Sequence, residues 1–180
     1  MDQEILFSTR ECVLGMMLVA KSERGVCAIL LGEDAGELRR DLQQRFPQAR
    51  LRDADVEFAP LVSKVAGFLA APAMGLNVPL DLRGNAFQLR VWSALREIPA
   101  GSTETYAEVA RRIGAPQKAK EVGEACAANA LAVAIPCHRL VRKDGGLGGY
   151  RWGVERKRAL LRREGAQEAG TADLFEPTRA

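Results

Sequence analysis

The first half of the chain alternates short apolar runs with turn residues, a pattern typical of a small sheet with flanking helices. Apolar runs over 12–20 and 26–31 predict two strands joined by a tight turn. Apolar residues at helical spacing then predict two helices, over 34–46 and 57–70, the first capped by its opening aspartate. Residues 1–82 are therefore predicted to form a small α/β domain.

After an extended link over 76–84, the spacing changes to that of helices. Four helices are predicted, over 85–97, 105–113, 117–128 and 155–164. The second and third are separated by a tight turn with Gly114, which is typical of a helix-turn-helix. Asn129 is the expected C-cap of the third helix, and the small, polar residues 166–180 are expected to be disordered. The pattern predicts a mainly helical domain over 83–165.

Charge is distributed unevenly along the chain, although the net charge is only +3. Residues 1–82 hold nine Lys and Arg against twelve Asp and Glu, whereas residues 83–163 hold sixteen against seven. The basic second half has two interpretations: an ordinary solvated face, or a module that binds a polyanion such as nucleic acid. Charge alone leaves both interpretations open.

The composition argues against several classes of protein. No apolar run reaches the roughly 18 residues of a membrane span, and the acidic N-terminus is unlike a signal peptide. We therefore expect a cytoplasmic protein without a membrane partner. The four cysteines form no C-x-x-C pair and His138 is the one histidine, so we expect neither a disulfide framework nor a metal site. Nothing in the sequence predicts a cofactor.

The segment Ile-Pro-Cys-His-Arg at 135–139 holds the most reactive side chains. A cysteine is a strong nucleophile as the thiolate, and His138 next to Cys137 can accept the thiol proton. Arg139 raises the local positive potential, and a carboxylate that orients the imidazole would complete a Cys–His–acid constellation. On this pattern alone, a cysteine beside a histidine is more often incidental packing than catalysis.

Residues from about 12 to 165 resemble the O6-alkylguanine-DNA alkyltransferase family, and within it the C-terminal half of the Ada-type bacterial members. The segments that carry the resemblance are SERGVCAILLG, LDLRGNAFQLRVWSALREIPAG, ACAANALAVAIPCHR and AIPCHRLVRKDGGLGGYRWGVERKRALLRREG. The resemblance implies a variable, ribonuclease-H-like α/β domain followed by a helical domain with a helix-turn-helix. It also implies a monomer that binds the minor groove of double-stranded DNA and rotates the damaged guanine out of the stack.

The resemblance further implies direct, single-use transfer of the alkyl group from O6-alkylguanine, with O4-alkylthymine as a second candidate substrate, to Cys137. His138 corresponds to the residue that deprotonates the thiol through a water, and Glu164 to the acid that orients this histidine. Asn129 corresponds to a hinge residue, and Tyr106 to the donor that helps protonate the departing guanine. The other residues implied to contact the DNA or the flipped base are Thr105, Lys120, Cys126, Arg139, Leu140, Tyr150 and Arg151.

The chain departs from the family pattern in the predicted recognition helix. Lys120 stands where the family usually has arginine, and Glu121 and Glu124 stand where it usually has small neutral residues. Lysine lacks the planar guanidinium fork, and carboxylates oppose phosphate binding. We therefore expect weaker or differently selective DNA binding. The basic runs at 156–158 and 162–163 are either a solvated helix face or distal phosphate contacts, and we favour the solvated face because charge runs are usually solvated.

Three alternative functions stay open. A sensor that binds alkylated DNA without repairing it would lack the nucleophile, so Cys137 argues against this class. An Ada-type regulator would need a cysteine-rich metal-binding domain that these 180 residues do not contain, so the chain is either a whole protein or a fragment of a longer one. A cysteine hydrolase fits the basic second half less well than a DNA-binding protein does.

Overall fold

The computed structural model describes residues 3–165. The chain divides into two compact units, one formed by Met1–Arg83 with Ala130–Ala134, the other by Gly84–Asn129 with the residues from Ile135 onward. Within the described range, no helix has both the length and the apolar character needed to cross a membrane. The predicted disordered tail at 166–180 lies outside the described residues.

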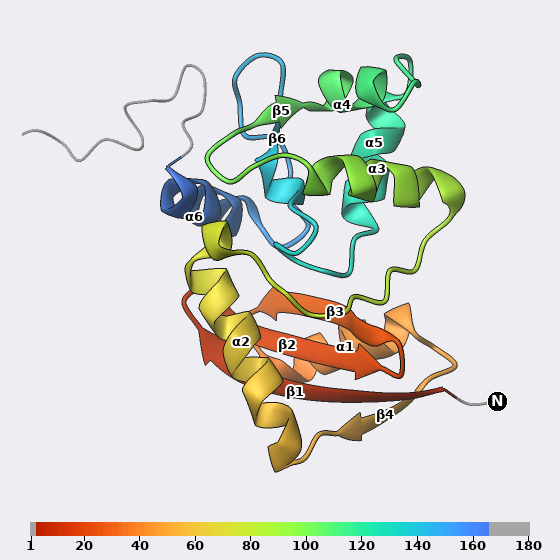
Figure 1. Cartoon of the computed structure of the whole chain (residues 1–180), viewed down its shortest axis with the longest axis vertical. Coiled ribbons are helices and arrows are strands. Elements are labelled where there is room, and N and C mark those ends of the chain that lie inside the picture. Colours follow the sequence, from red (N-terminus) through yellow and green to blue (C-terminus); the bar gives the residue numbers. More distant parts are fainter. Residues whose placement is uncertain (1–2, 166–180) are drawn as a thin grey trace, which may run out of the picture. The chain divides into compact units, whose positions relative to one another are not determined.

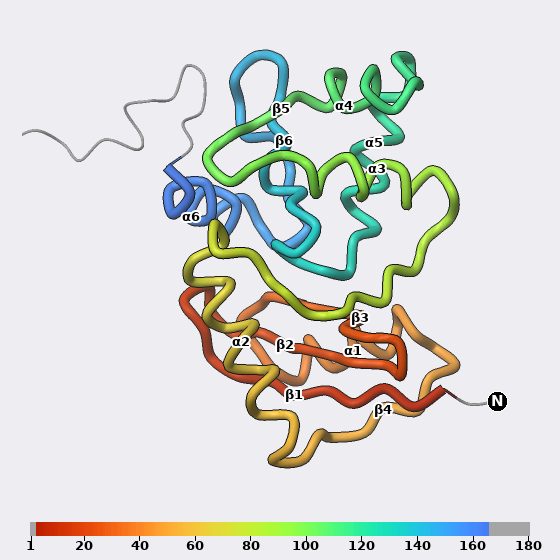
Figure 2. Tube along the Cα trace, viewed as in Figure 1, coloured from red at the N-terminus to blue at the C-terminus, as the bar shows by residue number. Residues whose placement is uncertain are grey.

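A mixed four-stranded sheet forms the centre of the first unit, with the strand order β3-β2-β1-β4 (Figure 2). Its strands are β1 (Glu4–Cys12), β2 (Gly15–Ser22), β3 (Gly25–Gly32) and β4 (Arg50–Asp53). The first three strands are antiparallel neighbours, and β4 pairs parallel with β1. The strand predicted over 12–20 began too early, because Val13 and Leu14 form a turn that ends at Gly15 with φ 109°.

Two helices cover this sheet, as the spacing of apolar residues predicted (Figure 1). Helix α1 (Ala35–Arg45) packs on β2 and β3, and α2 (Ala59–Ala70) packs on β1. The backbone N–H of Gly36 donates to the Asp34 carboxylate, which confirms the predicted cap of α1. Short 3₁₀ turns, η1 (Val56–Phe58) and η2 (Pro72–Met74), flank α2. Side chains of both helices complete a core whose burial is the main stabilising term.

Two extended segments bond to β3 and satisfy its backbone groups. Pro79 accepts from the N–H of Val26 at 2.9 Å, and the N–H of Ile29 donates to Ala130 at 2.8 Å. Most of the segment 76–84, which the sequence predicted as a plain link, is therefore part of this unit's structure, up to Arg83. Gly25 allows the close approach, because a Cβ there would lie 2.4 Å from the carbonyl oxygen of Pro79.

The second unit is mainly helical, as predicted, with one short parallel strand pair. Its elements are α3 (Ala86–Arg96), β5 (Glu104–Thr105), α4 (Tyr106–Arg112), α5 (Ala119–Ala127), η3 (Cys137–Arg139), β6 (Leu140–Val141) and α6 (Val154–Glu164). Capping boxes begin α3 and α4, which fixes where both helices start. The indole of Trp92 on α3 donates to the carbonyl of Ala125 on α5 at 2.9 Å. The C-cap of α5 is Ala128, so the prediction of Asn129 was wrong by one residue.

Candidate active site

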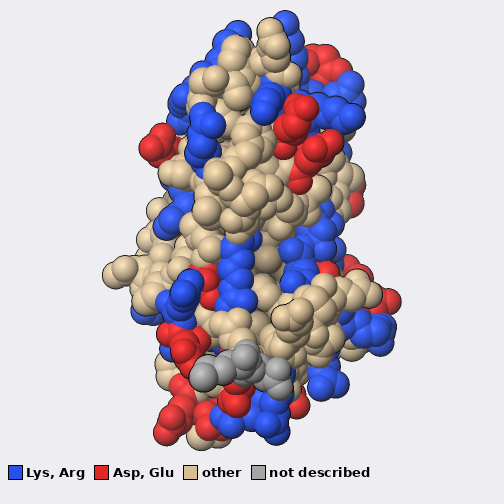
Figure 3. All heavy atoms as spheres, turned by 90° about the vertical axis from the view of Figure 1, so that its right-hand side faces the viewer, with Lys and Arg blue, Asp and Glu red and all other residues tan. Residues whose placement is uncertain are grey.

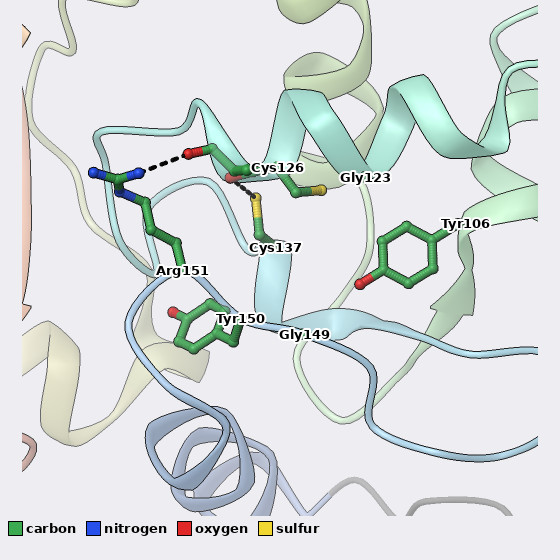
Figure 4. A pocket seen from close by; sticks show the side chains of 8 residues that line it. Tyr106, Gly123, Cys126, Cys137, Gly149, Tyr150 and Arg151 are labelled. Atoms are coloured by element: carbon green, nitrogen blue, oxygen red, sulfur yellow. Dashed lines mark hydrogen bonds between the residues drawn. The ribbon is translucent and has the colours of Figure 1, made fainter.

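Cys137 begins the single turn η3 in the second unit. Its backbone N–H donates to the carbonyl of Ile135 at 2.8 Å, which closes a tight turn around Pro136. The Cys137 side chain is 4% exposed, yet it lines a pocket of about 390 Å³ (Figure 4). The other lining residues are Tyr106, Gly123, Cys126, Ala127, Gly149, Tyr150 and Arg151. The pocket has the size of a small-molecule site, so a buried thiol here can still meet a substrate.

Asn129 connects the end of α5 to the turn that carries Cys137. Its side chain is completely buried, and its amide nitrogen donates to the carbonyl of Ile135 at 3.1 Å. The same nitrogen lies 3.4 Å from the sulfur of Cys137, and that sulfur lies 3.9 Å from the carbonyl oxygen of Cys126. These contacts fix the thiol relative to α5.

His138, Glu164 and Arg139 form a buried hydrogen-bonded cluster beside the thiol. The imidazole Nε2 lies 2.7 Å from Oε1 of Glu164, at the last residue of α6. The Arg139 guanidinium donates to both oxygens of this carboxylate, at 3.1 and 2.8 Å, and to the carbonyl of Ile98 at 2.6 Å. The side chains of His138 and Glu164 are both 0% exposed. The cluster therefore joins η3 rigidly to α6.

The protonation states of this cluster follow from burial and hydrogen bonding. Burial alone would raise the pKa of Glu164, but the hydrogen bonds from His138 and Arg139 outweigh it and lower that pKa to about 2. Burial lowers the pKa of His138, although the Glu164 carboxylate acts in the opposite direction. The imidazole is therefore neutral at neutral pH, with its hydrogen on Nε2 facing Glu164. This leaves Nδ1, which is buried and has no hydrogen-bond partner among residues 3–165, as the basic nitrogen.

The resting thiol of Cys137 is protonated. Burial raises the pKa of Cys137 well above its ordinary value, and the neighbouring thiol of Cys126 raises it further. The hydrogen bond from Asn129 and the charge of Lys157 lower this pKa. The sequence predicted that the positive charge of Arg139 favours the thiolate. In the structure the Arg139 guanidinium is bound to Glu164, and the positive charge that lowers the pKa of Cys137 is that of Lys157.

Lys157 is a buried residue beside the site that the sequence did not single out. Its side chain on α6 is 0% exposed, so the interpretation of 156–158 as a solvated face was wrong at this position. The Nζ atom donates to the carbonyl of Leu140 at 2.5 Å and to that of Gly149 at 3.1 Å. A signal was present, because Lys157 shares helical spacing with the buried Leu160 and Leu161.

Two tyrosines line the pocket on different sides of the thiol (Figure 4). Burial raises the pKa of Tyr106 to about 12, so its hydroxyl remains a proton donor at neutral pH. The ring of Tyr106 lies against Gly123, and a Cβ at Gly148 would lie 3.3 Å from its hydroxyl oxygen. The Tyr150 ring packs edge-on against His138, with centroids 6.4 Å apart. Both tyrosine side chains therefore form part of the pocket wall.

The remaining predicted residues lie around the pocket in different settings. Arg151 lines the pocket and donates to the carbonyl of Ala127 at 3.0 Å. Lys120 is exposed on α5 and Thr105 caps α4, and neither lines the pocket. Leu140 is buried, and its carbonyl is a partner of Lys157. Among the residues that the structure describes, no group of three or more Cys, His, Asp or Glu side chains is placed to hold a metal.

Comparisons with known proteins agree on one family. The family model of the 6-O-methylguanine DNA methyltransferase DNA-binding domain matches residues 86–166. The chain is 52% identical over 164 residues to the bifunctional transcriptional activator/DNA repair enzyme Ada of Escherichia coli. The matched region covers 91% of the chain and 46% of Ada. The chain thus spans about half the length of the Ada relatives it matches.

Shorter relatives match over most of their own length. The methylated-DNA–protein-cysteine methyltransferase of Mycolicibacterium paratuberculosis is 41% identical over 119 residues, 66% of the chain and 72% of that protein. The crystal structure of Mycobacterium tuberculosis OGT in complex with DNA superimposes with a TM-score of 0.74 at 32% identity, covering 96% of the chain and 99% of OGT. The chain therefore belongs to the methylated-DNA–protein-cysteine methyltransferase family.

Proposed function

We propose that the protein repairs alkylated DNA by transferring the alkyl group from O6 of guanine to the sulfur of Cys137. One observation carries this proposal. The thiol lines a pocket of about 390 Å³, and next to it the neutral His138 is held by Glu164 with a basic nitrogen left over. Displacement at an alkyl carbon needs a soft, strong nucleophile together with a base, and this arrangement supplies both.

The reaction begins with removal of the thiol proton. Because Nε2 of His138 faces Glu164, the proton goes to Nδ1 through a water molecule, and the resulting imidazolium is stabilised by the carboxylate. The sulfur of Cys137 then attacks the alkyl carbon, a carbon–sulfur bond forms, and the carbon–oxygen bond to O6 breaks. The electron pair of that bond stays on the guanine.

The departing guanine is stabilised by protonation. Tyr106 remains protonated at neutral pH, lines the pocket and is the donor for this step. The product on Cys137 is a thioether, which acid–base side chains do not cleave. Each molecule therefore acts once, and the repair is stoichiometric.

DNA binding is assigned to the second unit. Helices α4 and α5, separated by a turn at Gly114 with φ 79°, form the proposed helix-turn-helix, with α5 as the recognition helix in the minor groove. Residues 83–163 hold sixteen basic and seven acidic residues, which favours a phosphate backbone as the partner. Basic and acidic side chains are interspersed with broad neutral areas on the face in Figure 3.

The guanine must leave the stack to reach Cys137, because the thiol is 4% exposed. Lys120 on α5 is the residue proposed to occupy the space that the guanine leaves. Asn129, at the end of α5, is the proposed hinge that carries the position of this helix to the thiol. We further propose that a monomer is sufficient, because all of these residues come from one chain, and that the protein acts in the cytoplasm.

A non-repairing sensor of alkylated DNA is the second candidate, and the structure disfavours it. A sensor needs the pocket but not the nucleophile or the base. Cys137 is held by Asn129, and the adjacent His138 is hydrogen-bonded to Glu164, an arrangement that binding alone does not require. Transcriptional activation is a role of the Escherichia coli Ada protein, of which the chain covers 46%.

The test is incubation with a duplex that contains one O6-methylguanine, followed by intact-mass and peptide analysis. We expect one methyl group per protein, located on Cys137 and absent from Cys137→Ala. Cys126→Ala is the matched control, because this cysteine shares the pocket but lacks a base. A duplex with O4-methylthymine tests the second substrate. Unmodified protein beside persistent lesions, with protein in excess, would contradict the proposal.

A further inference from the structure

Lys157 is a buried cation that the packing of α6 does not require. Burying a lysine costs several kcal/mol unless its ammonium is hydrogen-bonded, and an unbranched apolar side chain would fill the same space. The structure compensates this cost with two backbone carbonyls, those of Leu140 and Gly149. A residue that is costly to bury and specifically bonded is a candidate for a functional role.

The two carbonyl partners belong to the two segments that frame the pocket. Leu140 follows η3 directly, three residues after Cys137. Gly149 lies in the segment between β6 and α6, and it lines the pocket together with Tyr150. A single ammonium group therefore holds the segment with the nucleophile and the opposite wall of the pocket to the same helix.

The ammonium also supplies positive charge close to the sulfur. The other titratable or charged groups around the thiol are Cys126 from α5, Tyr106 from α4, Tyr150 from the loop before α6, and the His138–Arg139–Glu164 cluster. In that cluster the guanidinium of Arg139 is bound to the carboxylate of Glu164, which offsets its charge. Nζ of Lys157 donates to two backbone carbonyls, and its positive charge lowers the pKa of Cys137, which favours the thiolate.

We propose that Lys157 is a positioning residue that stabilises the Cys137 thiolate and holds the Gly149 wall of the pocket in place. This inference rests on the proposed function for its biological meaning, because it assigns Lys157 a part in activating the nucleophile. The inference itself concerns only the Cys137 thiolate and the Gly149 wall of the pocket. The reactivity of the Cys137 thiol can therefore be measured without DNA.

The experiment measures the rate of alkylation of Cys137 by iodoacetamide from pH 6 to pH 10, on the rising part of the profile, where a change of the midpoint appears as a change of rate at each pH. Peptide mass spectrometry separates Cys137 from the other cysteines. In Lys157→Met we expect the pH midpoint to rise by about one unit, which slows alkylation about tenfold at fixed neutral pH. Lys157→Arg keeps the charge and should restore most of the rate. Lys64→Met removes an exposed lysine of α2 and should leave the profile unchanged.

Circular dichroism and thermal unfolding show which variants are folded. A folded Lys157→Met with the wild-type profile would overturn the inference, even if its stability were lower. If Lys157→Met does not fold, Lys157→Gln replaces it, because a neutral donor should shift the midpoint upward while Lys157→Arg does not. An equal profile for the Gln and Arg variants would also overturn the inference. Wild-type protein that fails to accept a methyl group from DNA would contradict the proposed function but leave this profile, and the inference, intact.

Discussion

Replacing Glu164 with glutamine tests how the cluster beside Cys137 is held together. The substitution keeps the size of the side chain but removes the charge that accepts from His138 at 2.7 Å and from Arg139 at 3.1 and 2.8 Å. A neutral amide has one acceptor oxygen, and its NH₂ group would face a donor. The variant therefore leaves buried polar groups without suitable partners, which is strongly destabilising.

The size of the effect follows from the pKa of Glu164. Folding lowers it from 4.5 to about 2, and each pKa unit corresponds to about 1.4 kcal/mol, so the linked stabilisation is about 3 kcal/mol. The Glu164 side chain is 0% exposed, so solvent screens its interactions with His138 and Arg139 only weakly. Since the folded pKa is the lower one, this stabilisation is complete above pH 4.5 and is lost as the pH falls towards 2.

The assay is urea unfolding at pH 7, 5 and 3, followed by the fluorescence of Trp92 and Trp152, both in the second unit. Glu164→Gln should lose about 3 kcal/mol at pH 7 and show a smaller further loss between pH 5 and 3 than wild type does. Glu155→Gln, on the same helix with its side chain 82% exposed, is the matched control and should behave like wild type. A loss below about 1 kcal/mol at pH 7, or parallel losses on acidification, would refute this reasoning.

Further substitutions probe the pocket and α5. In Gly148→Ala, a residue with a Cβ must adopt φ +74°, and that Cβ lies 3.3 Å from the Tyr106 hydroxyl oxygen. Urea unfolding should therefore show a loss of about 1–3 kcal/mol in the free energy of unfolding. Gly149→Ala is the control and should leave it unchanged, because a Cβ there has nothing within 4 Å. Tyr106→Phe should slow single-turnover methyl transfer about 10²-fold at unchanged melting temperature, because the proton donor is lost. Lys120→Arg combined with Glu124→Ala should raise the repair rate, since both changes favour phosphate binding; no gain would show that these residues are harmless.

The helices of the second unit could be predicted because local signals determine them. Helices α3 and α4 both begin at a capping residue in the sequence itself: Asn85 accepts from the N–H of Gln88, and Thr105 accepts from that of Glu108. In the first unit, β4 (Arg50–Asp53) was missed, since its four residues are mostly exposed and charged. Strand β1 was missed because its apolar residues are interrupted by polar ones near its end. Both strands depend on pairing with β-sheet neighbours rather than on their own composition.

The candidate site shows where sequence reasoning stops. The resemblance named Cys137, His138 and Glu164, and the structure brings them together; their roles stay a proposal. The protonation state of the thiol was not accessible in this way, because burial is a property of the folded chain, and it outweighs the neighbouring positive charges.

Lys157 also could not be identified from the sequence, because its burial and its hydrogen-bond partners depend on the fold. Its helical spacing with Leu160 and Leu161 indicated a buried face, but a lysine at such a position is normally expected to extend its charge to solvent. Its Nζ atom donates to backbone carbonyls 17 and 8 residues away. Every residue has a backbone carbonyl, so the sequence does not show which carbonyls will accept a hydrogen bond from a side chain. A functional group that depends on backbone acceptors can be recognised only once the chain is folded, whereas one that depends on side chains, such as Cys137 beside His138, can be found from the sequence.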